Sequence, residues 1–259
     1  MGIGDALMAA GEARKLHRSN NLPVMIVDPR GRPTRSPVWD GLPYILQDRA
    51  RGKPFTRMLN CGGHRPYIAG KSAEKWTWRP YKPIPAEIAF TPAERAFAEP
   101  YRGMVMLEPS VKDIGHRNKD WGPIYWSQLD CLTHGQRIPT VQCGPAGTRP
   151  LLYTRFVQTD TFRLAAAVLA VCKAFVGTEG GLMHAAAAVG TPAVIIWSEY
   201  ISPDITGYPT MRNLRHAGKP CGRRVDCDGC RQSLLAITPA MVLAELKDVL
   251  VSLQLERNE

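Results

Sequence analysis

The chain has 259 residues, of which 44% are hydrophobic and 22% charged, a balance typical of a globular protein and too apolar for a disordered one. No apolar run reaches the roughly 18–20 residues that a membrane-spanning helix needs, and the N-terminus lacks the pattern of a secretory signal. We therefore expect a cytoplasmic protein (in the host cytoplasm if the chain is viral), with peripheral membrane contact still allowed. The net charge of +10 favours an anionic partner such as nucleic acid, a phosphorylated glycolipid or a nucleotide, although a generally basic surface would give the same charge.

The first third of the chain shows little regular pattern. Residues 2–5 (GIGD) predict a turn that faces phosphate or substrate, and residues 6–18 predict a helix with basic residues at its end. Such a turn normally follows a strand, so either a first strand is missing or the sheet begins elsewhere. Residues 23–28 predict a short buried strand. Residues 29–85 combine aromatic with basic side chains, which suits either a surface that stacks rings beside phosphates or a small aromatic core.

The second half alternates strands with helices. Thr91, Pro92 and Glu94 predict a helix start with a capping box. Further strands are expected over 104–108, 138–142, 174–176 and 193–197, and helices over 124–133, 162–173 (with Thr161 as N-cap), 182–189 and from Thr238-Pro239 onward. This alternation predicts an α/β fold with a parallel sheet between layers of helices.

The stretch 174–198 is the most informative one. It predicts a buried strand, a glycine turn over 177–181, a small-residue helix and a second buried strand. Free backbone N–H groups and a partial positive charge at the start of such a helix can hold a phosphate, although many strand–helix–strand units carry glycines only to turn. The sequence is therefore compatible both with a phosphate site at this turn and with a turn that is only structural.

The cysteines are expected to be thiols or metal ligands, because an odd number, seven, without a secretory signal does not indicate a disulfide framework. His216, Cys221, Cys227 and Cys230 have the spacing H-x4-C-x5-C-x2-C, which is compatible with a tetrahedral structural zinc site. Free thiols near a C-terminal helix are the alternative.

Four segments together resemble the ADP-heptose:lipopolysaccharide heptosyltransferase family (glycosyltransferase family nine). They are Gly4-Asp5, Asn118 to Trp121 (NKDW), Glu179 to Ala187 (EGGLMHAAA) and the strand Pro192 to Trp197 running into Ser202-Pro203-Asp204. The resemblance implies a GT-B-like α/β fold with two Rossmann-like halves, the N-terminal half being shortened. We expect an acceptor-side domain over 1–95 and a domain over 96–259 that binds a nucleotide-sugar donor.

The same resemblance implies the roles of five residues. Asp5 would be the general base that takes a proton from an acceptor hydroxyl as its oxygen attacks the anomeric carbon. Lys119 and the N–H groups of Gly180 and Gly181 would stabilise the leaving nucleoside diphosphate without a metal or other cofactor. Glu179, where the family has aspartate, would bind hydroxyls of the sugar or ribose.

Further candidates are less specific. On the donor side these are Glu108, Lys112 and His184, and on the acceptor side Gly4, Arg14 and Trp39. Alternatives stay open for three residues: Asp5 as a helix N-cap, Lys119 as a solvated lysine and His184 as a hydrogen-bonded core residue.

The acceptor is the least defined partner. It could be an envelope glycolipid or oligosaccharide, as the resemblance implies, or a hydroxymethylated base in viral DNA, which the basic and aromatic residues would suit. A non-catalytic module that binds a nucleotide or nucleic acid on the same fold is the alternative to an enzyme.

Overall fold

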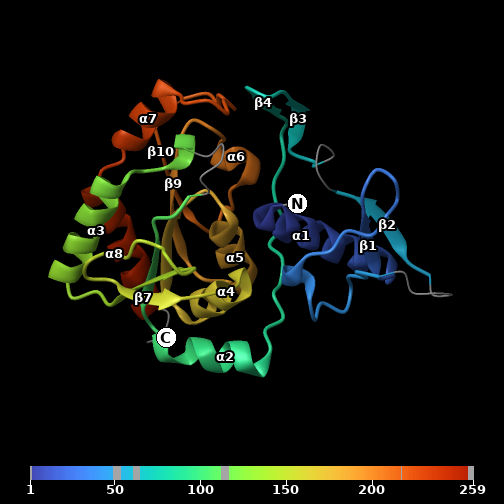
Figure 1. The fold of residues 1–259 in the computed structure, drawn as a ribbon, viewed down its shortest axis with the longest axis horizontal. Coiled ribbons are helices and arrows are strands. Elements are labelled where there is room, and N and C mark those ends of the chain that lie inside the picture. Colours follow the sequence, from blue (N-terminus) through green and yellow to red (C-terminus); the bar gives the residue numbers. More distant parts are fainter. Residues whose placement is uncertain (1, 49–53, 61–64, 112–116, 217, 256–259) are drawn as a thin grey trace.

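The computed structural model of the chain describes residues 2–48, 54–60, 65–111, 117–216 and 218–255. Two lobes are visible in Figure 1: a small one formed by the first third of the chain and a larger one built on a six-stranded sheet. In the ranges given, no helix combines the length and the apolar character needed to cross a membrane.

All six strands of the large sheet are parallel. In spatial order they are β10 (Arg212–Arg215), β9 (Ala193–Trp197), β8 (Ala174–Thr178), β5 (Val105–Glu108), β6 (Thr140–Gly144) and β7 (Arg155–Gln158). The chain enters at the central strand β5, adds β6 and β7 on one side, and then crosses back to add β8, β9 and β10 on the other. The strand order therefore reverses between β5 and β8, where Glu108 pairs with Gly177. Ligands of open α/β sheets bind at such a point, outside the carboxyl ends of the strands.

Helices cover both faces of this sheet (Figure 1). The helices of the large lobe are α2 (Pro92–Ala98), α3 (Pro123–Gly135), α4 (Phe162–Val171), α5 (Gly181–Val189), α6 (Pro203–Thr206), α7 (Asp228–Leu235) and α8 (Pro239–Leu255), with short 3₁₀ turns η3 (Glu99–Tyr101) and η4 (Arg117–Lys119). One apolar cluster lies between the sheet, α3 and α8, and a second lies between the sheet, α4 and α5. The predicted parallel sheet with helices on both faces is confirmed. In the last helix, α8, Val242, Leu246 and Val249 are buried against the sheet, whereas Met241 is 45% exposed.

The small lobe holds two short sheets. Its elements are α1 (Ile3–Asn20), β1 (Val24–Val27), the 3₁₀ turn η1 (Pro37–Trp39), β2 (Thr56–Leu59), β3 (Ile68–Lys71) and β4 (Trp76–Trp78). Strands β1 and β2 are parallel, and β3 and β4 form an antiparallel pair. The predicted strand over 23–28 is therefore confirmed. The predicted division of the chain at residue 95 stays a prediction.

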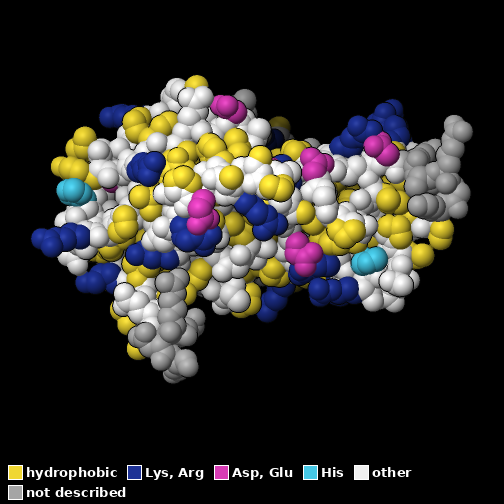
Figure 2. Space-filling view, turned by 90° about the horizontal axis from the view of Figure 1, so that it is seen from below, with side chains coloured by type: hydrophobic (Ala, Val, Ile, Leu, Met, Phe, Trp, Pro, Cys, Tyr) yellow, Lys and Arg dark blue, Asp and Glu magenta, His cyan; other side chains and the backbone are white. Residues whose placement is uncertain are grey.

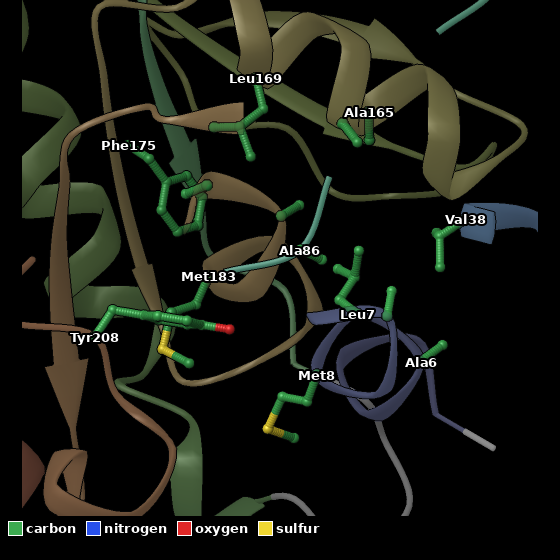
Figure 3. Packing of buried hydrophobic residues seen from close by; sticks show 14 of the residues in the cluster. Ala6, Leu7, Met8, Val38, Ala86, Ala165, Leu169, Phe175, Met183 and Tyr208 are labelled. Atoms are coloured by element: carbon green, nitrogen blue, oxygen red, sulfur yellow. The ribbon is translucent and has the colours of Figure 1, made fainter. Parts of the chain in front are cut away.

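Helix α1 begins at Ile3, so the prediction that residues 2–5 form a turn is wrong. Close packing explains the glycines instead. A Cβ atom on Gly4 would lie 2.7 Å from Cδ2 of His184, and one on Gly11 would lie 2.1 Å from the carbonyl oxygen of Ile84. Figure 3 shows Leu7 of α1 and Met183 of α5, which belong to the same apolar cluster.

Arg163 of α4 pairs with Glu94 of α2 and also donates a hydrogen bond to the small lobe. The predicted capping box of α2 is present, because the Thr91 hydroxyl accepts from the Glu94 N–H and the Glu94 carboxylate accepts from the Thr91 N–H. The same carboxylate accepts two hydrogen bonds from Arg163 at 2.6 and 2.8 Å, and this guanidinium also donates to the carbonyl oxygen of Pro37 in the small lobe.

Candidate functional site

A cavity of about 630 Å³ lies where the strand order reverses. Its walls come from both lobes: the first turn of α1 and the β3–β4 hairpin on one side, and the ends of β5 and β8 with the start of α5 on the other. Five predicted site residues with ionisable side chains line it, namely Asp5, Glu108, Lys119, Glu179 and His184. The fold therefore brings Asp5 and Glu179, which are far apart in the sequence, into one cavity.

The glycine turn after β8 leads directly into α5. Gly180 is the N-cap of the helix, and no side chain caps it. The leading N–H groups of α5 thus face the cavity that Gly180 and Gly181 line. A Cβ on Gly4 would lie 3.7 Å from the Cα of Gly181, which places the first turn of α1 against that of α5. Two positive helix ends converge here, an arrangement suited to an anion.

Lys119 and Glu179 form an ion pair inside the cavity, and their side chains are only 14% and 11% exposed. The ammonium of Lys119 also lies 4.9 Å from the ring centre of Tyr200. The turn η4 and the end of β8 position these residues beside the start of α5. Lys119 is therefore held at the cavity and is not a freely solvated lysine.

Asp5 occupies the first turn of α1, with Gly2 as the N-cap, so the alternative of Asp5 as a mere N-cap does not apply. One carboxylate oxygen accepts a hydrogen bond of 2.5 Å from the Tyr67 hydroxyl, and the other lies 2.9 Å from the guanidinium of Arg65. Arg65 and Tyr67 precede the β3–β4 hairpin and orient the carboxylate. The role of these two residues could not be predicted from the sequence, because their partner Asp5 lies some 60 positions earlier. The only local signal was the mixture of aromatic and basic residues over 29–85.

Glu108 ends β5 and lines the floor of the cavity. Burial raises the pKa of this carboxyl from its ordinary 4.5 to about 7, although the N–H of Ser110 donates to it at 2.9 Å. Its carboxyl is therefore poised between the neutral and ionised forms near neutral pH.

His184 is almost fully buried, and its Nδ1 shares a hydrogen bond of 2.9 Å with the hydroxyl of Tyr208. Burial lowers the pKa of the imidazole, which favours the neutral ring, although Glu179 lies 3.9 Å away. The arrangement is that of a hydrogen-bonded core residue whose ring edge also reaches the cavity.

A basic and aromatic rim surrounds the side of the cavity near Asp5. The Trp76 ring is covered by two cations, with Nζ of Lys71 at 4.2 Å and the guanidinium carbon of Arg224 at 5.3 Å from its centre. Trp76 and Trp78 both line the cavity. Aromatic faces next to cations suit an anionic sugar or base.

Two acceptor-side predictions are wrong. Trp39 is only 1% exposed, because its indole N–H donates to the carbonyl oxygen of Ala6 in the core of the small lobe. Arg14 is held away from the cavity by the carboxylate of Glu87 at 2.6 Å. Gly4 does line the cavity, and Lys112 lies outside the described residues.

Three of the four predicted metal ligands come together. The sulfur atoms of Cys221, Cys227 and Cys230 all lie within 4.8 Å of one another. His216 is exposed just beyond the edge strand β10 and lies outside this group of three sulfur atoms. The reason is that the segment after it folds back toward the end of β9, where the Cys221 N–H donates to the carbonyl oxygen of Glu199.

A second hollow of about 880 Å³ lies between α3 and the start of α8 and shares no lining residue with the first. It is wide and mostly apolar, and Arg149 is the one charged residue among the described residues that line it. We place the functional site at the sheet reversal, because charged and polar groups converge there.

Comparison with known proteins identifies the segment around this site. Residues 159–225 match the family model of glycosyltransferase family 9 (heptosyltransferase). The chain is similar to glycosyltransferase family 9. Lipopolysaccharide heptosyltransferase 2 of Escherichia coli K12 is 39% identical over 92 residues, which are 34% of this chain and 26% of that protein. The Salmonella typhimurium protein of the same name is 40% identical over 91 residues, 33% and 26% of the two chains. The chain thus matches about a quarter of the length of these relatives.

Solved structures extend the likeness to the whole fold. A family 9 glycosyltransferase from Veillonella parvula superposes with a TM-score of 0.64 over 97% of this chain and 95% of that chain, at 9% identity. The E. coli ADP-heptose lipopolysaccharide heptosyltransferase II superposes with a TM-score of 0.50 over 65% and 54%, at 24% identity. The predicted GT-B-like α/β fold is therefore confirmed.

Proposed function

We propose that the chain is a glycosyltransferase that moves a sugar from a nucleotide-sugar donor to a hydroxyl group of an anionic acceptor. One observation carries this proposal: a single cavity brings Asp5 of the small lobe opposite Lys119, Glu179 and the start of α5 in the large lobe. The family 9 match over residues 159–225 includes the glycine turn and α5 and agrees with it.

The donor would bind on the large lobe. Its diphosphate would lie at the N–H groups of Gly180 and Gly181, and Lys119 would turn from Glu179 toward the phosphate oxygens. Glu179 would accept hydrogen bonds from hydroxyls of the ribose or sugar. The E. coli heptosyltransferase II of similar fold is an ADP-heptose enzyme, which favours ADP as the first nucleotide to test.

The reaction would begin at Asp5. Its carboxylate would take the proton of the acceptor hydroxyl while that oxygen forms a bond to the anomeric carbon, and the bond from that carbon to the diphosphate oxygen would break. The nucleoside diphosphate would leave with the bonding electrons. Lys119 and the two helix starts would stabilise the negative charge that it gains, so that this chain's own residues supply the positive charge needed.

The acceptor would lie on the small-lobe side of the cavity, against Trp76, Lys71 and Arg65. Arg65 contacts Asp5, so an acceptor held there would lie next to the proposed base. On the face shown in Figure 2, Lys and Arg side chains are scattered and do not gather in one band. The two cations beside the Trp76 ring at the cavity rim suit an anionic sugar of a glycolipid or oligosaccharide, which we take as the acceptor in preference to a base of DNA. A salt series tests this choice, since DNA retention at low salt that falls steeply with added salt would favour a base of DNA as acceptor.

Replacing Asp5 tests the chemistry. A thermal-shift screen against ADP-, GDP-, UDP- and CMP-sugars first selects the donor. With that donor, Asp5→Asn should lower sugar transfer or donor hydrolysis by about a hundredfold or more, whereas Asp160→Asn, an exposed aspartate outside the cavity, should leave it unchanged. Equal turnover by both variants would refute a base at Asp5, and no turnover by the unmodified chain would favour a non-catalytic binding module.

A further inference from the structure

A three-cysteine cluster lies next to the cavity without forming part of it. Cys230 is fully buried in the first turn of α7, and Cys221 and Cys227 lie in the preceding segment, half-buried. All three sulfur atoms lie within 4.8 Å of one another. A disulfide would use two of them and leave the third, whereas three converging thiolates are the usual ligands of a soft divalent metal.

A carboxylate lies within reach as a fourth ligand. Gly229 stands between Cys227 and Cys230, and a Cβ placed on it would lie 3.0 Å from Oε2 of Glu199 and 3.9 Å from the sulfur of Cys227. Glu199 lies outside the group of three sulfur atoms in this structure, so its side chain would have to turn toward them to complete a set of three sulfur atoms and one oxygen. Zinc accepts this combination of ligands.

The segment that carries Cys221 and Cys227 (residues 218–227, the cysteine segment) has little regular secondary structure and is held by hydrogen bonds to neighbouring parts of the chain. Over residues 218–227 it forms no helix or ladder, apart from one isolated bridge from Arg223 to Lys75 of the small lobe. The N–H of Gly222 donates to the carbonyl oxygen of Tyr200, and the Gly222 oxygen accepts from the Trp76 N–H. A segment of this kind lacks a core, and a metal can supply the missing stability.

The same segment holds the residue that precedes Lys119. The buried amide of Asn118 donates to the carbonyl oxygens of Arg223 and Val225, both at 2.8 Å, and accepts from the Cys227 N–H at 3.0 Å. All of these bonds go to the cysteine segment. The position of that segment therefore sets the position of Asn118 and, through the backbone, of Lys119.

We propose that Cys221, Cys227 and Cys230 bind one zinc ion, with Glu199 as the fourth ligand, and that this ion fixes the cysteine segment against Asn118 and so positions Lys119 at the cavity. The ion is structural and does not touch substrate. Its binding is independent of the proposed glycosyl transfer, whereas the positioning of Lys119 rests on that function.

Elemental analysis of the full chain, purified with a non-chelating reductant, tests the site. It should find about one zinc per chain. The zinc should be lost in Cys227→Ser and in Cys230→Ser but retained in the control Cys131→Ser, whose cysteine is exposed on α3. The intact mass of the chain is measured in parallel under non-reducing conditions. Absence of a transition metal from the unmodified chain, or a mass lower by two hydrogens that shows a disulfide, would overturn the proposal, and iron in place of zinc would overturn the choice of metal.

Calorimetric titration with ADP tests the positioning role. Cys227→Ser should bind ADP about tenfold more weakly than Cys131→Ser. If Cys227→Ser does not fold, removal of the metal from the unmodified chain with a chelator should give the same loss, reversed by added zinc. Equal ADP affinity with and without metal would overturn the positioning role, whereas a metal-loaded chain that does not bind ADP at all would contradict the proposed function and leave the metal site standing.

Discussion

Replacing Glu108 by Gln gives a quantitative test of the cavity. The fold raises the pKa of Glu108 from 4.5 to about 7 by burial, so the folded chain favours the neutral carboxyl. Because the folded chain holds this proton more tightly than the unfolded chain, protonated Glu108 stabilises the fold. This contribution is fully present below pH 4.5 and is lost as the pH rises through 7. At about 1.4 kcal/mol for each unit of pKa, the loss amounts to at most about 3 kcal/mol of unfolding free energy. Gln cannot ionise, so this loss should be absent in Glu108→Gln.

The assay is urea unfolding followed by the fluorescence of the buried tryptophans, at intervals from pH 4.5 to 8.5. The difference between the unmodified chain and Glu108→Gln cancels the titration of groups that both proteins share. We expect the unmodified chain to lose about 2–3 kcal/mol more than the variant across this range. Glu74→Gln, at an exposed glutamate of the small lobe, serves as control. Parallel curves for the unmodified chain and Glu108→Gln would refute a pKa of Glu108 raised to about 7.

Three further predictions concern the packing of the two lobes. Gly4→Ala should destabilise the fold by about 1–3 kcal/mol, because the new Cβ would lie 2.7 Å from the His184 side chain. Gly135→Ala, whose Cβ would meet nothing within 4 Å, should not. Equal melting temperatures for the two variants would contradict this. Arg163→Met should cost about 3–5 kcal/mol in urea unfolding, since it leaves Glu94 without its partner, and Arg163→Met with Glu94→Gln should recover part of the loss; no recovery would contradict the reasoning. Arg163 also lowers the pKa of Glu94 from 4.5 to about 2, so stability should fall as the pH drops from 4.5 toward 2, and Glu94→Gln should reduce that fall in acid unfolding curves.

The large lobe could be predicted from sequence because its signals are local. Apolar runs such as 193–197 and caps such as Thr161 depend on residues close together in the chain, and each is present in the structure. The edge strands β7 and β10 were missed, since most of their side chains are exposed or half-buried and no apolar run marks them.

The small lobe and the site depended on contacts between distant residues. Gly4 suggested a turn, but the close approach of His184 requires a glycine within a helix. Trp39 suggested a surface for stacking, but a carbonyl oxygen of α1 accepts its N–H in the core. The contact of Arg65 and Tyr67 with Asp5 joins a hairpin to a helix start, and no short pattern marks such a pair.

The central claim is that the start of α5 and Lys119 hold a nucleoside diphosphate opposite Asp5. A crystal structure of the chain with ADP tests it most directly. We predict the terminal phosphate beside the Lys119 ammonium and the N–H of Gly181, with the Asp5 carboxylate facing it across the cavity. ADP bound elsewhere, for example in the apolar hollow between α3 and α8, or Asp5 turned away from the phosphate, would contradict the account.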